Sequence, residues 1–346
     1  MLLTAMLLMA LRQGQSVSPP QPSAAEVAVL QAKAQAGDAD AKLRLGEVYE
    51  RGAGVKQSDE EAAKWYEKAA SQGNSAAEVD LGVLLWSGRG VPEDKTKAVE
   101  WYRKAARQGN GSAMFNLGSA YYNGEGVATD ELQALAWFLL AEEHGSVHAS
   151  DAVRRFEKTS QPDEFNRAYA QIAEMLIAGT ELSQDYVAAA KWYARAAKRG
   201  DTTAAVHLAR ILAKEGGEYK TALGWCQFAA DRENPVAMYC MGWLYHEGKL
   251  GPKDSKLAAD WFEKGAYSAN AQSCLMLGRM YWDGDGVEAD KVTAYKWALV
   301  ASKMLPQAQE DVASFRVTMS EKEIHKAEEL ARGYFGRHQF GAEMSW

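Results

Sequence analysis

Apolar residues recur along residues 73–108 with the spacing expected of two short helices. Apolar positions lie on one helical face in AAEVDLGVLLWSG and again in AVEWYRKAARQ. Between these stretches lies GRGVPEDKTK, whose glycines, proline and charges are typical of a loop. The pattern therefore predicts a helix-loop-helix unit, with a left-handed glycine at the end of each helix.

The same unit recurs with a period of about 36 residues. A tryptophan marks one position in seven copies: Trp65, Trp101, Trp137, Trp192, Trp225, Trp261 and Trp297. A single hairpin cannot bury its apolar face alone, so neighbouring copies must stack. We therefore predict an all-α fold, a right-handed α/α superhelical solenoid of about seven helix-loop-helix repeats with N- and C-terminal capping helices.

Segments outside the repeats predict the remaining organisation. Ser23 with Glu26 and Ser320 with Glu323 match capping boxes that begin terminal helices. An insertion after the third repeat resembles the segment that follows Trp297, so we expect a former terminal cap, with a bend or register change, inside the chain. The expected parts are 1–18 signal peptide, 19–36 spacer and N-terminal capping helix, 37–145 repeats 1–3, 146–163 inserted linker helix, 164–304 repeats 4–7, and 305–346 C-terminal capping helices.

The N-terminal apolar run, LLTAMLLMAL, is about half the length needed to span a bilayer. It is more typical of a signal peptide, which predicts export to the periplasm or the medium; a cytoplasmic location is the alternative. No other stretch approaches transmembrane length, so we expect no membrane insertion of the mature chain.

Composition narrows the functional classes. A net charge of −7 and a pI near 5.6 argue against a nucleic-acid-binding surface. Three cysteines in 346 residues are too few for a disulfide scaffold. Eleven tryptophans are an unusual number, and seven of them mark the repeat.

The repeat resembles the Sel-one-like repeat, a relative of the tetratricopeptide repeat. The resemblance covers about residues 37–304 and implies an α/α superhelix that acts as an adaptor for other proteins, often in exported bacterial proteins. Repeats 4 and 5 depart from the pattern, because Ala173 and Ala209 replace a glycine and the glycine-rich loop is missing. In the first repeat the pattern is carried by Ala41, Leu45, Gly46, Tyr49, Gly52, Gly54, Val55, Ala62, Trp65, Tyr66, Lys68, Ala69, Ala70 and Gly73.

The chain contains only parts of the known phosphate-binding and metal-binding motifs. The Gly-x-Gly-Val loops lack the third glycine and the Lys-Ser/Thr of a phosphate loop. Asp283, Asp285 and Asp290 do not have the spacing of a calcium loop, and a glycine separates His144 from His148. We therefore predict no enzymatic activity, no metal and no cofactor.

The cysteines leave alternatives open. Cys226 and Cys240 lie equally far from the turn near Glu233, so a disulfide between antiparallel helices and two buried thiols are both possible. We favour buried thiols. Cysteine-rich relatives, which are linked to β-lactam chemistry, pair a cysteine at the position of Cys274 with one eight residues earlier, where this chain has Ala266.

The family resemblance implies that the first helix of each hairpin lines a concave face. In the first repeat this helix carries the pair Leu45-Gly46. Aromatic and charged residues recur one and four residues after the glycine of this pair, or three residues before it. Such residues are enriched in binding surfaces. We predict a scaffold that binds a protein or peptide along this groove, with Glu47 and Glu50 meeting basic groups at one end. The alternatives are a cell-wall or β-lactam-acting enzyme and a cytoplasmic regulatory scaffold. The predicted partner-binding residues are Trp86, Phe115, Tyr122, Arg210, Tyr239, Trp243, His246, Arg279 and Trp282.

Overall fold

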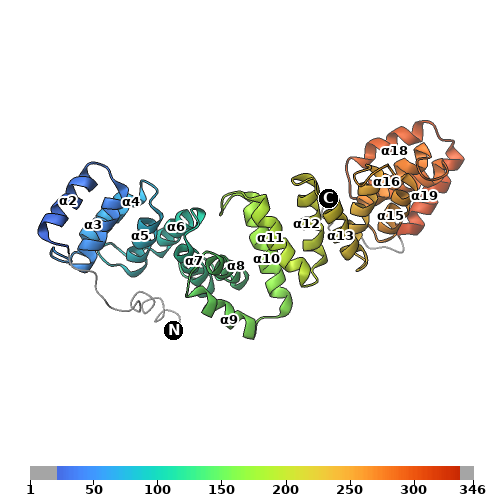
Figure 1. Ribbon diagram of the computed structural model, residues 1–346. Helices are drawn as coiled ribbons and strands as arrows, with labels where there is room; N and C mark the ends of the chain where they lie inside the picture. The colour runs from blue at the N-terminus through green and yellow to red at the C-terminus, as the bar shows by residue number, and fades with distance from the viewer. Residues whose placement is uncertain (1–21, 336–346) are drawn as a thin grey trace. The chain divides into compact units, whose positions relative to one another are not determined.

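The computed structural model describes residues 22–335, and all 18 secondary-structure elements in this range are helices. The chain divides into two compact units, one up to Ala189 and one from Ala190, within α11 (Tyr186–Lys198). Each unit is a run of antiparallel helices (Figure 1). The predicted all-helical solenoid is confirmed, whereas the predicted signal peptide lies outside the described residues.

The first unit contains three complete hairpins, with one helix before them and two helices after them. Within each hairpin the two helices pack on each other, and each second helix packs on the first helix of the next repeat. The helix α2 packs on α3 and begins at the predicted capping box, where Glu26 accepts a hydrogen bond from the Ser23 N–H at 2.7 Å. The helices are α2 (Ala24–Gln35), α3 (Ala39–Arg51), α4 (Asp59–Ala70), α5 (Ser75–Ser87), α6 (Lys95–Arg107), α7 (Gly111–Asn123), α8 (Glu131–Glu143), α9 (Ala149–Thr159) and α10 (Pro162–Ala178).

The second unit repeats the same packing through three further hairpins. Its last helix begins beside the predicted Ser320–Glu323 capping box, where the Ser320 N–H donates to the Glu323 carboxylate at 2.8 Å. The helices are α12 (Thr202–Lys214), α13 (Tyr219–Ala230), α14 (Pro235–His246), α15 (Ser255–Tyr267), α16 (Ala271–Asp283), α17 (Lys291–Ala301), α18 (Ala308–Val317) and α19 (Glu321–Phe335).

An aromatic ring packed on a glycine sets the spacing of most hairpins. The residue after the marker tryptophan is Tyr66 in the first repeat, and a Cβ added at Gly46 would lie 2.5 Å from its ring. The same contact joins Gly82 to Tyr102, Gly118 to Phe138 and Gly242 to Phe262. Gly278 differs from these four glycines, because it faces backbone atoms of Ala294 and Ala298 on the second helix.

The marker tryptophans do not all have the same environment. Trp137, Trp192 and Trp297 are buried, while the other four are half-buried. In three of those four a lysine three residues later covers the ring, with its Nζ 3.6 to 4.1 Å from the ring centroid: Lys68 on Trp65, Lys104 on Trp101 and Lys264 on Trp261. These pairs combine cation–π attraction with burial of the lysine stem.

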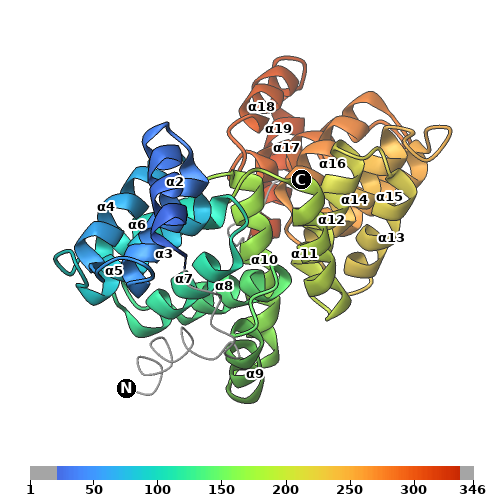
Figure 2. The same ribbon diagram turned by 60° about the vertical axis from the view of Figure 1, so that its left-hand side comes forward.

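The inserted segment and the C-terminal segment have the same packing. Both α9 and α10 pack on α8, and both α18 and α19 pack on α17 (Figure 2). Each segment also places a phenylalanine on a first-helix aromatic residue, Phe156 on Tyr122 and Phe315 on Trp282. The internal helix therefore has the contacts of a terminal cap. The bend or register change expected over 146–163 remains a prediction.

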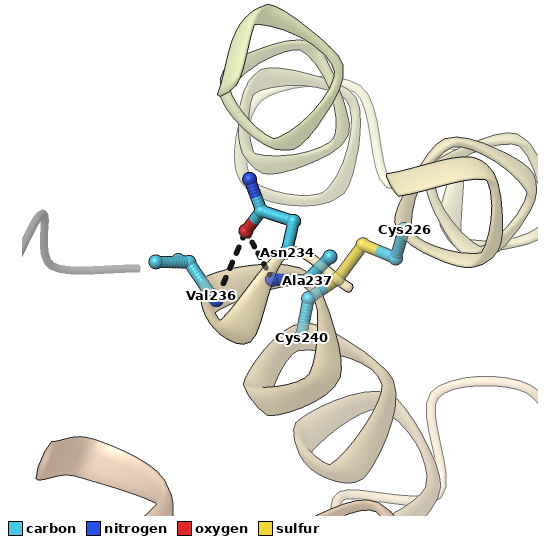
Figure 3. Close-up of a disulfide and its surroundings, with 5 residues drawn as sticks. All are labelled: Cys226, Asn234, Val236, Ala237 and Cys240. Atoms are coloured by element: carbon cyan, nitrogen blue, oxygen red, sulfur yellow. Dashed lines mark hydrogen bonds between the residues drawn. A yellow bond between two sulfur atoms is a disulfide. The ribbon is translucent and has the colours of Figure 1, made fainter. Parts of the chain in front are cut away.

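Cys226 and Cys240 form a disulfide, so the buried thiols that we favoured are not found. The bond joins α13 to α14 over a Cα–Cα distance of 6.1 Å (Figure 3). Asn234 caps α14 between the two cysteines by accepting from the N–H groups of Val236 and Ala237. In the hairpin α12–α13, Ala209 replaces the glycine of the first helix, and Cys226 replaces the aromatic residue that packs on that glycine in other repeats. The disulfide therefore starts from a hairpin that lacks the ring-on-glycine contact.

Two residues hold a left-handed backbone where the other repeats have glycine. Glu233 and Ala269 have φ values of 62° and 63°, at the position that Gly73 and Gly109 occupy in earlier repeats. The added Cβ makes this conformation costly by about 1–2 kcal/mol. The structure therefore contains two local strains that glycine would relieve.

We predict that Ala269→Gly raises the free energy of unfolding by about 1 kcal/mol, because glycine adopts this φ without the steric cost. Gly73→Ala is the matched control, since a Cβ there would meet nothing within 4 Å and only the backbone conformation is tested. We expect it to lower the free energy by a similar amount. Urea titration followed by circular dichroism measures both, and unchanged stability of Ala269→Gly would contradict the assignment.

A second prediction concerns the disulfide. Replacing both cysteines by serine is expected to lower the free energy of unfolding by about 3 kcal/mol, since the bond closes a short loop in the unfolded chain. Its cysteines lie 14 positions apart in the sequence. Reduction of the wild-type protein should reproduce this loss, while the double variant should not respond to the reductant. A wild-type melting temperature that is insensitive to reduction would contradict the pairing.

Candidate interaction surface

The predicted binding residues lie on the first helices of the hairpins. In the second unit α12 contacts α14 and α14 contacts α16, so these first helices are neighbours. We call their combined exposed side the first-helix face. It carries six of the nine predicted residues, namely Arg210, Tyr239, Trp243, His246, Arg279 and Trp282.

On a first helix, the residue three positions before the glycine and the residue four positions after it both contact the aromatic ring that packs on this glycine. On α14 the Tyr239 ring lies 5.7 Å from Phe262, and the His246 ring lies 6.3 Å from it. Burial, then the charge of Glu247, raises the pKa of Tyr239. These two predicted binding residues therefore also form the border of the hairpin core, because positions i−3, i and i+4 share one side of a helix.

The residue directly after the glycine points elsewhere, about 100° around the helix. At this position on α14 lies Trp243, which is half-buried and packs against the buried residues of two hairpins. The Nζ of Lys249 lies 5.9 Å from its ring centroid. Trp243 is thus held in place by both neighbours and keeps part of its surface exposed.

The next first helix, α16, contributes Arg279 and Trp282. The Nε of Arg279 lies 2.8 Å from a carboxylate oxygen of Asp311 on α18, and its side chain is 46% exposed. Trp282 is half-buried, stacked on Phe315 with ring centroids 4.0 Å apart. Helix α18 of the C-terminal cap therefore covers the end of the first-helix face, a contact that the repeat period does not indicate.

Two basic residues, His207 and Arg210, lie about one turn apart on α12. Arg210 is half-buried, and His207 stacks on Tyr193 at 5.1 Å. Burial, and then the positive charge of Arg210, lowers the pKa of His207 to about 4. At neutral pH the positive charge here therefore comes from Arg210.

The first unit holds the remaining three predicted residues. Trp86 is only 8% exposed and packs on Tyr102 at 6.2 Å, so little of it is available to a partner. Phe115 is half-buried against Phe138 at 5.5 Å. Tyr122 is 39% exposed, with Phe156 of α9 against its edge.

The structure places two further kinds of residue that sequence reasoning missed. Phe156 and Phe315 cover predicted binding residues, and the signal for them was their similar distance from the marker tryptophans Trp137 and Trp297. Asp80 is a half-buried carboxylate on α5, two residues before its glycine. The equivalent residue is Arg44 in the first repeat and Asn116 in the third. Because the carboxylate does not recur from repeat to repeat, the repeat pattern does not mark Asp80.

Other candidate chemistry is scattered. Among the described residues no three His, Cys, Asp or Glu side chains are grouped to hold a metal ion. Cys274 is buried, with its sulfur 3.9 Å from the carbonyl oxygen of Ala266. None of the helices between residues 22 and 335 has the length and apolar character needed to cross a membrane.

Comparison with known proteins identifies the repeat. The Sel1 repeat model matches six segments that together span more than half of the chain: 39–74, 75–110, 111–146, 166–201, 235–270 and 271–304. The hairpin between the fourth and fifth matches, α12–α13, has the fold of a repeat without matching the model. No curated protein matches the chain significantly.

Two solved structures are similar to this chain. A Sel1 repeat protein from Oxalobacter formigenes is 30% identical, with a TM-score of 0.40, and the match covers 84% of this chain and 79% of that one. The c5321 protein of uropathogenic Escherichia coli, described as a protective antigen displaying an SLR fold, is 26% identical, with a TM-score of 0.47, over 94% of this chain and 77% of that one. With six matched repeats and a 30% identical relative, the chain belongs to the Sel1 repeat family.

Proposed function

We propose that this protein is a non-catalytic scaffold that binds a protein or peptide on the first-helix face of its second unit. Sel1 repeat solenoids are commonly protein-interaction scaffolds. The observation that carries the proposal is the placement of Trp243 and Arg279 on adjacent helices, each held by neighbouring residues and each partly exposed.

The side-chain chemistry of this face supports a protein partner. Tryptophan, tyrosine and arginine are the residues most enriched at binding hot spots. Because Trp243 packs between two hairpins and the Asp311 carboxylate holds Arg279, little side-chain entropy is lost when a partner contacts them. The first-helix face therefore offers a preorganised surface with an aromatic centre and cationic groups on α12 and α16.

We predict that Trp243→Ala weakens partner binding at least tenfold, since it removes the aromatic centre. Peptides selected from a displayed random library on the whole chain serve as the probe, and fluorescence anisotropy measures affinity. Trp261→Ala is the matched control, because Trp261 is also half-buried and packs against the same buried residues, but from the second helix α15.

The control should bind the selected peptide with nearly wild-type affinity, even where truncation lowers its melting temperature. If Trp243→Ala and Trp261→Ala bind equally well, or if both lose affinity equally, the first-helix face is not the binding surface.

We further infer that the protein works in an oxidising compartment, as a secreted or periplasmic protein would. The Cys226–Cys240 disulfide supports this, because such bonds persist outside the reducing cytosol. Trapping thiols with an alkylating reagent in intact native cells before lysis tests the inference. We expect both cysteines to be recovered as the disulfide, whereas alkylation of both would indicate a cytoplasmic protein.

A further inference from the structure

The loops inside the hairpins also connect neighbouring repeats. Four loops read Gly-x-Gly-Val, and three of them have a charged middle residue: Arg89, Glu125 and Asp285. In each of these three, the second glycine lies so close to the first residue of the preceding repeat's second helix that a Cβ would collide with its backbone. The contacts are Gly90 on Asp59, Gly126 on Lys95 and Gly286 on Ser255. We call each of these contacts a loop joint.

The two loop joints of the first unit carry ion pairs of opposite polarity. Arg89 donates to the Asp59 carboxylate from Nε at 3.1 Å and from Nη2 at 2.9 Å. At the next joint the loop residue is the acid, and Glu125 accepts from Lys95 at 2.7 Å. The four side chains are 23–37% exposed, so solvent screens these pairs less than it screens fully exposed ones.

Each polarity occurs with a second contact to the end of the preceding first helix. Arg89 also donates to Glu50 of α3 at 3.1 Å. In the second unit Asp285 accepts from Lys253 at 2.8 Å and lies 3.2 Å from Nε2 of His246 on α14. Glu50 and His246 both lie 39 positions before the loop residue that they contact, so they occupy the same repeat position. The loop residue thus holds both helices of the preceding hairpin.

The apolar packing between repeats is nearly the same at both junctions of the first unit. The buried alanines correspond one to one: Ala69, Ala70 and Ala77 at the first junction, and Ala105, Ala106 and Ala113 at the second. Small side chains of equal size do not distinguish one neighbouring repeat from another. Slipped stacking and exchange of repeats between copies are characteristic failures of repeat proteins.

The charges of the loop joints differ where the alanines do not. If the loop of the third repeat docked on the first repeat, Glu125 would face Asp59. If the loop of the second repeat docked on the second repeat of another copy, Arg89 would face Lys95. Both wrong pairings place like charges together, which disfavours them. At these two joints the native order pairs opposite charges.

We propose that the charged loop residues fix the order of the repeats. Each one attracts the preceding repeat and repels the others, and this suppresses slipped stacking and domain-swapped dimers, in which two copies exchange repeats. The inference does not rest on the proposed function, because it concerns contacts within the chain and needs no partner.

Reversing one joint tests the pairing. Lys95→Glu and Glu125→Lys each place like charges at the second joint, so we expect each to lower the melting temperature of the whole chain by about 2–4 °C. The double variant should recover more than half of this loss. Recovery is incomplete because Glu93 lies 3.7 Å from Lys95 and the Trp86 ring 5.5 Å from it.

The matched control is the Glu60–Lys64 pair, which lies within α4 at 2.8 Å with side chains 70% and 51% exposed. It joins no repeats, so Glu60→Lys and Lys64→Glu should show little coupling in the same cycle.

The double variant Lys95→Glu with Glu125→Lys also tests the order. Its second joint has the polarity of the first, so a slipped pairing no longer brings like charges together. After refolding from urea at high protein concentration, we expect about threefold more dimer than for wild type, measured by size-exclusion chromatography with light scattering. The control double variant Glu60→Lys with Lys64→Glu should form as little dimer as wild type.

Two results would overturn the proposal. If the double variant melts no higher than the less stable single variant, the two side chains are not paired. If it recovers stability but forms no more dimer than wild type, the pairs stabilise the joints without selecting the order of the repeats. Neither result bears on the peptide affinity of Trp243→Ala.

Discussion

The packing of one aromatic ring on one glycine organises most hairpins of this protein. Because Gly46, Gly82, Gly118 and Gly242 lack a Cβ, a tyrosine or phenylalanine of the second helix lies directly on the first helix. The ring extends along that helix and meets the residue four positions later, as the Tyr66–Glu50 hydrogen bond and the Trp86–Tyr102 contact show. This contact decides which first-helix residues border the core and which face outward, and therefore which of them belong to the proposed binding surface.

Where the ring is missing, a different interaction takes its place. In the hairpin α12–α13 the pair is Ala209 and Cys226, and Cys226 is bonded to the next first helix through Cys240. In the hairpin α16–α17 the ring is replaced by Ala298, and backbone atoms of α17 approach Gly278 directly. The repeat thus tolerates changes at its central contact when another contact restores the link between helices.

The sequence predicted the repeats, both terminal capping boxes and the location of the first helices, because these follow from local periodicity and hydrogen-bonding chemistry. It could not predict how much of each first-helix residue is exposed. Trp86 and Trp282 occupy the same repeat position, yet one packs on Tyr102 and the other is stacked on Phe315 from a capping helix. Likewise burial, and then the carboxylates of Glu50 and Glu47 one repeat away, raise the pKa of Asp80. Trp86 and Tyr102 are 16 positions apart and Trp282 and Phe315 are 33 apart, and at such separations the repeat period predicts a residue's position but not its neighbours.

We propose that the first helices of the hairpins, and not the second helices, form the binding surface. Hydroxyl-radical footprinting tests it directly, because half-buried tryptophans lie on both kinds of helix and report on accessibility in one experiment. With a bound peptide, we predict that oxidation of Trp243 on α14 decreases while oxidation of Trp225 on α13 and Trp261 on α15 stays at the level of the unbound protein. Protection of Trp225 and Trp261 with no change at Trp243 would contradict it.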